Sequence, residues 1–272
     1  MSRIQARTSK KLALAGACAA AVAAALVPNS TPAQAMSAAP PPAHADFDYQ
    51  IGGAYTPPAG VEVVSRDHTA APVPGLYNIC YVNAFQAQPD AEDDWASDLL
   101  LRDANGDVVY DTKWGEAFLD IRTDAKRKRI AEQVGTWIDN CADKGFDAIE
   151  PDNYDSYTRS GKLLDSADAQ AFIKLLAARA HADGLAIGQK NTVELAPERQ
   201  ENGLDFAVAE ECGQYDECGD YTAEFGDHVI VIEYNDEGMA KACAEWGDTL
   251  SVVRRDEDVS PRGSSGYVRE TC

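Results

Sequence analysis

Short apolar segments alternate with longer amphipathic segments along most of this chain, and this alternation restricts the possible folds more than any other feature. Eight short segments have the composition of β-strands: 47–51, 76–82, 117–121, 146–150, 185–189, 206–209, 229–233 and 250–253. Most are apolar without strict polar alternation, which is typical of strands that are covered on both faces. The pattern therefore predicts a parallel sheet with helices packed against its outer face.

Amphipathic segments between these strands predict the covering helices. The segment from Asp124 to Asp143 has apolar residues at helical spacing and is followed by Gly145, a typical helix terminator. Segments 166–183 and 239–246 have the same character. Eight strands in this length favour an α/β fold of the (β/α)8 TIM-barrel type in one domain. A doubly wound open sheet is the alternative, but no glycine-rich phosphate motif follows any strand.

The amino terminus has the features of an export signal. A basic start precedes an Ala-rich apolar run, and Ala33-Gln34-Ala35 is a small-x-small cleavage motif. We expect residues 1–35 to be a signal peptide that is cleaved after Ala35, with a second possible site at Ala43-His44-Ala45. Residues 36–45 are rich in Ala and Pro, and we expect a disordered lead-in there. The folded domain is then predicted at residues 46–272, in a secreted, extracellular protein.

Cysteine content and charge agree with export and limit the partners. Six of the 7 cysteines lie after the predicted signal, so disulfides are expected, with Cys212 and Cys218 as the first choice of pair. The formal net charge is −21. An acidic surface repels nucleic acid and anionic membranes and attracts a polycation. We therefore expect neither a nucleic-acid partner nor a membrane contact after signal removal, and we expect a monomer.

Polar side chains gather at the carboxyl ends of the predicted strands, where a barrel of this class places its chemistry. They are Gln50, Asn83, Asp120, Arg122, Glu150, Asp152, Lys190, Asn191, Glu210, Glu211, Glu233, Tyr234, Arg254 and Arg255. Two carboxyl groups with different protonation states are what glycosidic cleavage requires. Clusters of acids, amides and aromatic residues at one barrel rim thus predict a sugar-binding cleft.

The two carboxylates are expected at the ends of the segments 146–150 and 206–209. Alternation places Glu150 and Asp152 on the side of the barrel axis, with Asp152 nearer the mouth. At the second strand end, Glu211 faces the axis if Phe206 packs against helices, whereas a bend brings Glu210 inward. The residues alone leave this choice open. The sequence contains no zinc-protease or calcium-loop motif, so neither a metal nor another cofactor is predicted.

Several segments together resemble a known family. They are Tyr49-Gln50-Ile51-Gly52-Gly53, Ile79-Cys80-Tyr81-Val82, Leu119-Asp120-Ile121-Arg122, Glu150-Pro151-Asp152-Asn153, Gly188-Gln189-Lys190-Asn191, Ala209-Glu210-Glu211-Cys212 and Val231-Ile232-Glu233-Tyr234. From residue 47 to 255 the chain is similar to glycoside hydrolase family 114, the endo-α-1,4-polygalactosaminidases. The Glu-Pro-Asp-Asn and Glu-x-Cys motifs carry most of this resemblance.

The resemblance implies a TIM barrel that hydrolyses α-1,4-linked galactosamine polymers of the galactosaminogalactan type. It implies Asp152 as nucleophile or base and Glu210 as general acid/base, because the family motif has Glu two residues before this Cys. It also implies that further polar residues contact the sugar: Tyr81, Asp120, Lys190, Asn191 and Tyr234. Asn153, next to Asp152, has a side-chain amide that can donate to a sugar hydroxyl and is predicted to do the same. A polymer of free galactosamine is cationic at neutral pH, so its charge complements that of the chain.

Two other functions remain open at this level. The chain could hydrolyse another α-linked glycan, such as a neutral galactoside, or it could be a barrel that binds carbohydrate without cleaving it. The presence of both acids favours an enzyme over a binding protein.

Overall fold

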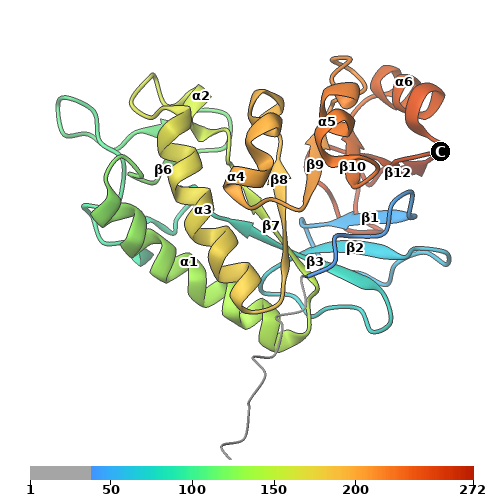
Figure 1. The fold of residues 1–272 in the computed structure, drawn as a ribbon, viewed down its shortest axis with the longest axis horizontal. Helices are drawn as coiled ribbons and strands as arrows, with labels where there is room; N and C mark the ends of the chain where they lie inside the picture. Colours follow the sequence, from blue (N-terminus) through green and yellow to red (C-terminus); the bar gives the residue numbers. More distant parts are fainter. Residues whose placement is uncertain (1–37) are drawn as a thin grey trace, which may run out of the picture. The chain divides into compact units, whose positions relative to one another are not determined.

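The fold is an α/β barrel whose axis is surrounded by eight parallel strands. The computed structural model describes residues 38–272, so the predicted signal peptide lies outside the described residues. The strands are β1 (Phe47–Gln50), β2 (Val63–Asp67), β3 (Tyr77–Asn83), β7 (Ala148–Asp152), β8 (Ala186–Lys190), β9 (Phe206–Glu210), β10 (Val229–Glu233) and β11 (Ser251–Arg255). They are neighbours in this order, and β12 (Arg269–Thr271) pairs antiparallel with β11. The predicted TIM-barrel class is thus confirmed (Figure 1).

Alternate residues of each strand point into the barrel and form stacked layers. The lower layers are apolar and include Phe47, Ile79, Ala148, Phe206 and Ile230. Tyr49, Glu150 and Lys190 extend the inward-facing positions towards the carboxyl ends of the strands, and all three are buried. The barrel interior therefore changes from apolar to polar along its axis, towards the end at which TIM barrels bind their ligands.

Gly188 of β8 leaves room for a large neighbour in the barrel interior. A Cβ at this position would lie 2.9 Å from two ring atoms of Phe206. Phe206 is fully buried and belongs to the interior cluster, so its ring replaces the side chain that Gly188 lacks. This packing fixes the register of β8 against β9, in which Gly188 pairs with Phe206.

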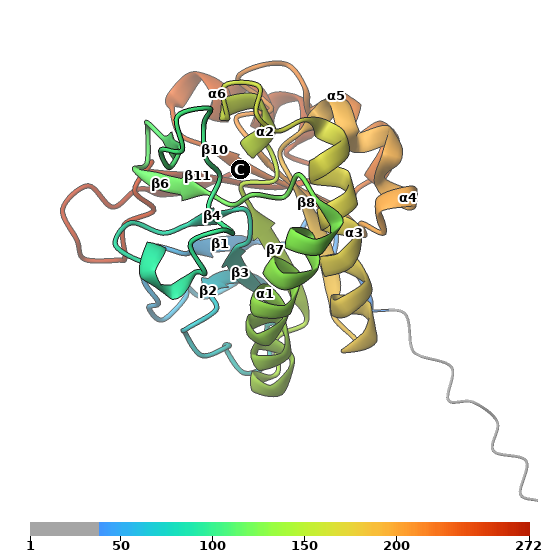
Figure 2. The same cartoon turned by 90° about the vertical axis from the view of Figure 1, so that its left-hand side faces the viewer.

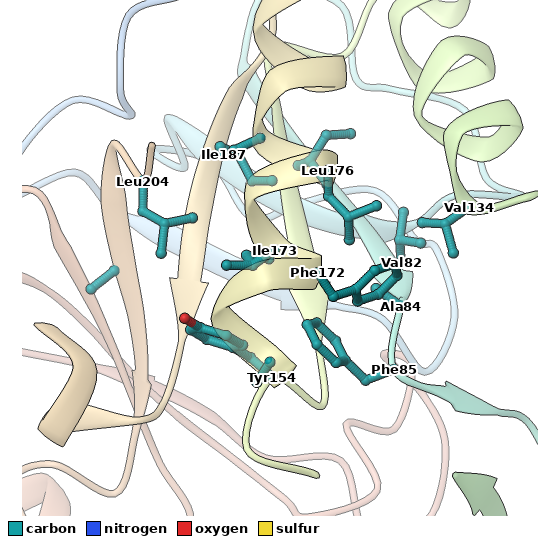
Figure 3. Close-up of a cluster of buried hydrophobic side chains, with 14 of the residues drawn as sticks. Val82, Ala84, Phe85, Val134, Tyr154, Phe172, Ile173, Leu176, Ile187 and Leu204 are labelled. Carbon is teal, nitrogen blue, oxygen red and sulfur yellow. The ribbon is translucent and has the colours of Figure 1, made fainter. Parts of the chain in front are cut away.

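The outer face of the barrel is covered by helices. They are α1 (Asp124–Lys144), α2 (Ser156–Arg159), α3 (Ser166–Ala182), α4 (Arg199–Asn202), α5 (Cys218–Phe225) and α6 (Asp236–Trp246), with the 3-10 helix η2 (Val193–Glu198) before α4. α1 begins at Thr123, whose side chain accepts from Lys126 N, and ends at Gly145 in the left-handed region. Figure 3 shows how Phe172, Ile173 and Leu176 of α3 meet Val82 and Ile187 of the barrel. This apolar layer holds the strand ends in place.

The first three strands are joined without helices, and here the sequence-based strand assignment was wrong in part. Segment 63–67, which is not among the eight predicted strands, forms β2 and pairs with β1 and β3. Segment 117–121, predicted as the third barrel strand, instead overlaps β6 (Glu116–Phe118) of a separate sheet. Segment 63–67 reads Val-Val-Ser-Arg-Asp and lacks an apolar run, and periodicity does not reveal which partner a strand pairs with.

The separate sheet belongs to an insertion between β3 and α1. It contains β4 (Gln86–Ala87), β5 (Tyr110–Asp111) and β6 in the antiparallel order β4-β6-β5, and the 3-10 helix η1 (Glu92–Asp94) lies in the same insertion. Phe118 and Leu119 are fully buried and join the main core cluster, which anchors the insertion to the barrel. Its strands β4 and β6 are labelled in Figure 2.

The seam between β11 and β1 is closed by side chains. Arg269 of β12 donates to the carbonyl of Phe47 at 3.0 Å and lies 3.2 Å from Asp48. Arg255 of β11 is fully buried and donates to the carbonyls of Val268 and Ser260, each at 2.8 Å. Charged groups thus connect the two edge strands, where a backbone ladder would close an ideal barrel.

Residues 38–45 lie against the barrel and differ in this respect from the disordered lead-in that the sequence predicts. The Tyr77 hydroxyl donates to the carbonyl of Ala39 at 2.7 Å, and Ala45 N donates to the Ser251 hydroxyl at 2.9 Å. Pro41 is buried, and its carbonyl lies 3.0 Å from His228 Nδ1. Ala/Pro-rich composition predicted a loop without regular structure, but tertiary contacts fix its path.

Three disulfides connect the described residues. Cys212 pairs with Cys218, as the sequence predicts, Cys80 pairs with Cys141, and Cys243 pairs with Cys272. The disulfide Cys80–Cys141 joins β3 to α1, and Cys243–Cys272 joins α6 to the carboxyl terminus. Among residues 38–272, no helix is both long enough and apolar enough to span a bilayer.

The substitution Gly188→Ala should destabilise the barrel, because its methyl group overlaps the ring of a fully buried phenylalanine. Overpacking of this kind costs about 1–3 kcal/mol. Gly135→Ala is a matched control, since Gly135 lies inside α1 and the nearest atom to its added Cβ is 3.9 Å away. Urea denaturation should give a lower unfolding free energy for the first variant alone. Equal stability of the two variants would contradict the packing described for Phe206.

Candidate active site

A large cavity opens at the carboxyl ends of the strands. Its volume is about 560 Å³. Strand ends supply Tyr81, Asp152 and Glu210, and the insertion supplies Trp114 and Glu116. The loop between β11 and β12 adds a wall made of Glu257, Asp258 and Val259. The carbonyl of Val259 lies 2.4 Å from where a Cβ on Gly52 would be, so only glycine allows this loop to approach β1 so closely.

Lys190 forms the floor of this site. Its side chain is 2% exposed, and Nζ lies 3.0 Å from Glu150, 3.4 Å from Asp152 and 3.6 Å from Glu210. Burial by itself would lower the pKa of Lys190, but the charges of Asp152 and Glu210 raise that pKa well above its usual value. Lys190 is therefore a permanent cation beneath Asp152 and Glu210. Because one oxygen of each acid lies within 3.6 Å of Nζ, the two carboxylates converge on the same point.

Asp152 is held by donors on three sides. Tyr81 donates its hydroxyl proton to Oδ2 at 2.6 Å, and Asn153 N donates to Oδ1 at 2.8 Å. Burial would raise the pKa of Asp152, but the charge of Lys190 and the Tyr81 hydrogen bond outweigh it and lower the pKa below its usual value. The carboxylate therefore stays ionised at neutral pH.

Glu210 faces the cavity from the end of the next strand but one. Asn191 Nδ2 donates to Oε2 at 2.9 Å, Tyr234 donates its hydroxyl proton to Oε1, and Glu210 N donates to Asn191 Oδ1 at 2.9 Å. The side chain is thus oriented by neighbours on both sides, β8 and β10.

The choice between Glu210 and Glu211 follows from the packing of β9. Phe206 and Val208 lie in the barrel interior and not against helices, so alternation brings Glu210 to the same side. Glu211 is turned away by a left-handed backbone with φ of 60°, and its amide donates to the carbonyl of Ile232 at 2.7 Å. Glu211 lines the outer part of the cavity.

Left-handed residues follow the last inward-facing side chain of three adjacent strands. After Asp152, Lys190 and Glu210 come Asn153, Asn191 and Glu211, with φ of 64°, 51° and 60°. Non-glycine residues rarely adopt this conformation, asparagine being the best suited, and it gathers at functional sites. The turn sends each following loop outward and leaves Asp152 and Glu210 facing the cavity, with Lys190 beneath them.

Glu150 supports the acids from below. It is fully buried, and it accepts from Tyr49 Oη at 2.8 Å, Ser65 Oγ at 2.6 Å and Lys190 Nζ at 3.0 Å. Both carboxylate oxygens are thus satisfied within the protein. Sequence alternation correctly put Glu150 on the axis side, and the structure places it under the cavity and not in its wall.

Most of the residues predicted to contact sugar lie around the cavity. Tyr81, Asn153, Asn191 and Tyr234 line it, whereas Lys190 lies just beneath. Asp120 is the exception, because segment 117–121 does not belong to the barrel. It is buried beside the start of α1, where it binds Lys126 at 2.6 Å and Arg122 at 2.8 Å, which lower its pKa to about 2 against the effect of burial.

Sequence reasoning did not assign the walls of the cavity. Trp114 and Glu116 come from the insertion, and Glu257 and Asp258 come from the loop after β11. No strand-end position identifies these residues, because their loops fold back over the barrel mouth. Eight acidic residues line the cavity against two basic ones: Asp67, Glu116, Asp152, Asp155, Glu210, Glu211, Glu257 and Asp258 against Lys113 and Arg159. The site therefore has a strongly negative potential.

Two carboxylates held around one sugar-sized cavity have the arrangement that glycosidic cleavage needs. Among residues 38–272, no group of three or more His, Cys, Asp and Glu side chains is arranged to hold a metal ion.

Known proteins share this fold. Over 85% of this chain and 96% of theirs, the coordinates of Aspergillus fumigatus Ega3 in complex with galactosamine superimpose with a TM-score of 0.67 at 24% identity. The glycoside hydrolase domain of PelA from Pseudomonas aeruginosa gives a TM-score of 0.56 at 16% identity, over 81% and 97%. A search of curated protein sequences finds no match.

A family model agrees with the geometry of the site. The model of glycoside hydrolase family GH114 matches residues 28–272, which is nearly the whole chain. Together with the barrel and its carboxylate-lined cavity, this match shows that the chain is a glycoside hydrolase and belongs to family GH114.

Proposed function

We propose that this protein hydrolyses α-1,4-linked galactosamine polymers with Asp152 and Glu210 as its catalytic pair. The observation that carries the proposal is the position of both carboxylates around one buried ammonium group, that of Lys190, at the base of an acidic cavity. Two acids that come from β7 and β9 are thereby presented to the same sugar linkage.

The two acids differ in their surroundings, which suits them to different roles. Asp152 is the nucleophile or base, because Lys190 and Tyr81 keep its pKa low and its carboxylate ionised. Glu210 is the general acid/base, and Asn191 and Tyr234 orient it towards the leaving oxygen. Glycosidic cleavage passes through an oxocarbenium-like state, and an ionised carboxylate at the sugar stabilises that positive charge.

The charge of the cavity supports a cationic substrate. Eight acids against two bases attract a polymer of free amino sugars and hold it by complementary charge. Ega3, which shares the fold, has been crystallised with galactosamine, and this supports the same sugar here. Exposed Trp114 at the cavity edge offers an aromatic face to a pyranose ring.

Three disulfides support export to an oxidising compartment, in line with the predicted signal peptide at residues 1–35. We therefore place the protein outside the cell.

Asp152→Asn and Glu210→Gln should each reduce activity on the galactosamine polymer by about 10²–10⁴-fold, the range typical of lost acid-base groups. Glu211→Gln is the matched control, since it removes a neighbouring carboxyl that points away from the Lys190 cluster. It should reduce activity less than about tenfold by the same scale. Reducing ends released per minute measure the effect, and circular dichroism checks folding.

A large loss in Glu211→Gln with an active Glu210→Gln would overturn the assignment of Glu210. If the wild type binds the polymer but releases no reducing ends, the barrel is a binding protein. Cleavage of a neutral α-galactan in preference to the amino polymer would instead indicate another α-linked glycan as substrate.

Added salt should weaken binding of the galactosamine polymer. Screening at 1 M ionic strength shortens the Debye length to about 3 Å, so attraction between the acidic cavity and distant amino groups is lost. We expect the Michaelis constant to rise between 0.05 and 1 M NaCl, which are conditions of the assay, while kcat changes little. A Michaelis constant that stays level over this range would argue against a cationic substrate.

Lys190→Met should destabilise the fold and shift the pH dependence of activity. Removing the cation leaves Glu150, Asp152 and Glu210 without it, and loss of one partner of a buried ion pair costs about 3–5 kcal/mol. The pKa of Asp152 then rises, so the acidic limb of kcat/KM moves to higher pH. Because protonation of Asp152 removes its uncompensated charge, the stability deficit relative to the wild type should shrink as the pH is lowered. Thermal unfolding at several pH values tests this sign.

A further inference from the structure

Glu116 is an acid of the cavity wall that has no cationic partner of its own. It opens β6, and the insertion brings it back to the end of β7, where Asn153 Nδ2 donates to its Oε2 at 3.3 Å. When the amide of Gln86 is oriented so that both its atoms find partners, it donates to the same oxygen at 3.0 Å. Among residues 38–272, neutral amides are thus the direct partners of this carboxylate.

The other acids near Glu116 already have their counter-charges. Arg159 lies 2.7 Å from Asp111 and also pairs with Asp155, and Lys190 compensates Asp152. None of these cations forms an ion pair with Glu116. A carboxylate that is largely withdrawn from water and surrounded by amides is a site for a charged donor from outside the chain.

The position of Glu116 relative to Asp152 decides what that donor is. Asn153 contacts both acids, since its backbone amide donates to Asp152 and its side chain donates to Glu116. Asn153 therefore lies between the carboxylates of Asp152 and Glu116 in the cavity wall. A sugar placed against Asp152 has its ring substituents within reach of Glu116, and a free amine is the substituent that supplies a charged N–H donor.

We propose that Glu116 binds the ammonium group of the galactosamine unit next to Asp152, and so selects sugars with a free amine over N-acetylated sugars. This inference rests on the proposed function and names a specificity-determining residue for it. An N-acetyl group would place a neutral and larger substituent against the carboxylate and leave its charge without a partner. The insertion, and not a barrel strand, then determines which form of the polymer is cleaved.

The protonation of Glu116 fits this role. Burial raises its pKa, the neighbouring amides of Asn83 and Asn153 oppose this, and the charges of Asp152 and Asp111 add to the rise, so that the pKa is about 7. Arg159 is held by Asp111 and Asp155 and forms no ion pair with Glu116. In the empty cavity the carboxyl is thus partly protonated at neutral pH, and an ammonium group that binds there displaces the proton.

Glu116→Gln tests the proposal, with Glu257→Gln as the charge-matched variant. Glu257 also lines the cavity, but its side chain is 68% exposed and it lies in the loop between β11 and β12. We expect Glu116→Gln to lower kcat/KM on the galactosamine polymer about 10- to 100-fold, as for a lost hydrogen bond to a charged group. High salt should abolish the smaller defect of Glu257→Gln but leave that of Glu116→Gln, because a buried contact is screened less.

Two further readouts separate recognition of the amine from a structural effect. The wild type should cleave the free polymer faster than the same polymer after chemical N-acetylation. In Glu116→Gln, the ratio of the rate on the free polymer to the rate on the N-acetylated polymer should be at least tenfold smaller. In addition, the Michaelis constant of the wild type should rise as the pH falls through about 7, because Glu116 takes up a proton, and this dependence should be absent in Glu116→Gln.

The outcomes distinguish this inference from the proposed function. If the wild type cleaves neither polymer, the proposed function fails. If it cleaves both equally well, or if Glu116→Gln and Glu257→Gln have the same defect at low and high salt, the role of Glu116 is overturned. An equal loss on both polymers in Glu116→Gln would make Glu116 a structural residue.

Discussion

The ammonium group of Lys190 lies at the top of the barrel interior, in contact with carboxylates from both neighbouring strands. Glu150 and Asp152 come from β7 and Glu210 from β9, all within 3.6 Å of Nζ. Burying three like charges close together would be prohibitive without a cation, and burying Lys190 would be equally unfavourable without them. The polar end of the barrel is therefore stable only as a unit, and the contacts that stabilise it also hold Asp152 and Glu210 on either side of the cavity.

Packing below this cluster determines where the charges end up. Gly188 and Phe206 fill the barrel interior together, one without a side chain and the other with a large ring. Because Phe206 points inward, strand alternation puts Glu210 and not Glu211 on the axis side. The left-handed residues after each strand then turn the loops away from the acids. The register of β8 against β9 therefore determines both the packing of the barrel interior and the inward position of Glu210.

The proposed catalytic acids and the proposed specificity residue lie on different parts of the fold. Asp152 and Glu210 sit on strand ends that are fixed by the barrel, whereas the walls of the cavity come from the insertion and from the loop after β11. Loops of this kind tolerate change better than strands, so a fixed reaction can be combined with variable substrate contacts. Glu116 belongs to the insertion and Glu257 to the loop after β11, and Glu257 is the more exposed of the two.

The sequence by itself determined the fold class, the close disulfide Cys212–Cys218, and the strands that carry Asp152, Lys190 and Glu210, because local periodicity and strand-end chemistry are encoded by neighbouring residues. It did not determine that segment 63–67 enters the barrel while segment 117–121 leaves it, and Asp120 was misplaced for this reason. Strand pairing depends on partners that are distant in the chain, so only the tertiary structure decided it. The same holds for the inward turn of Glu210, which depends on Phe206 meeting Gly188, and for Glu116, which a folded-back insertion brings to Asn153.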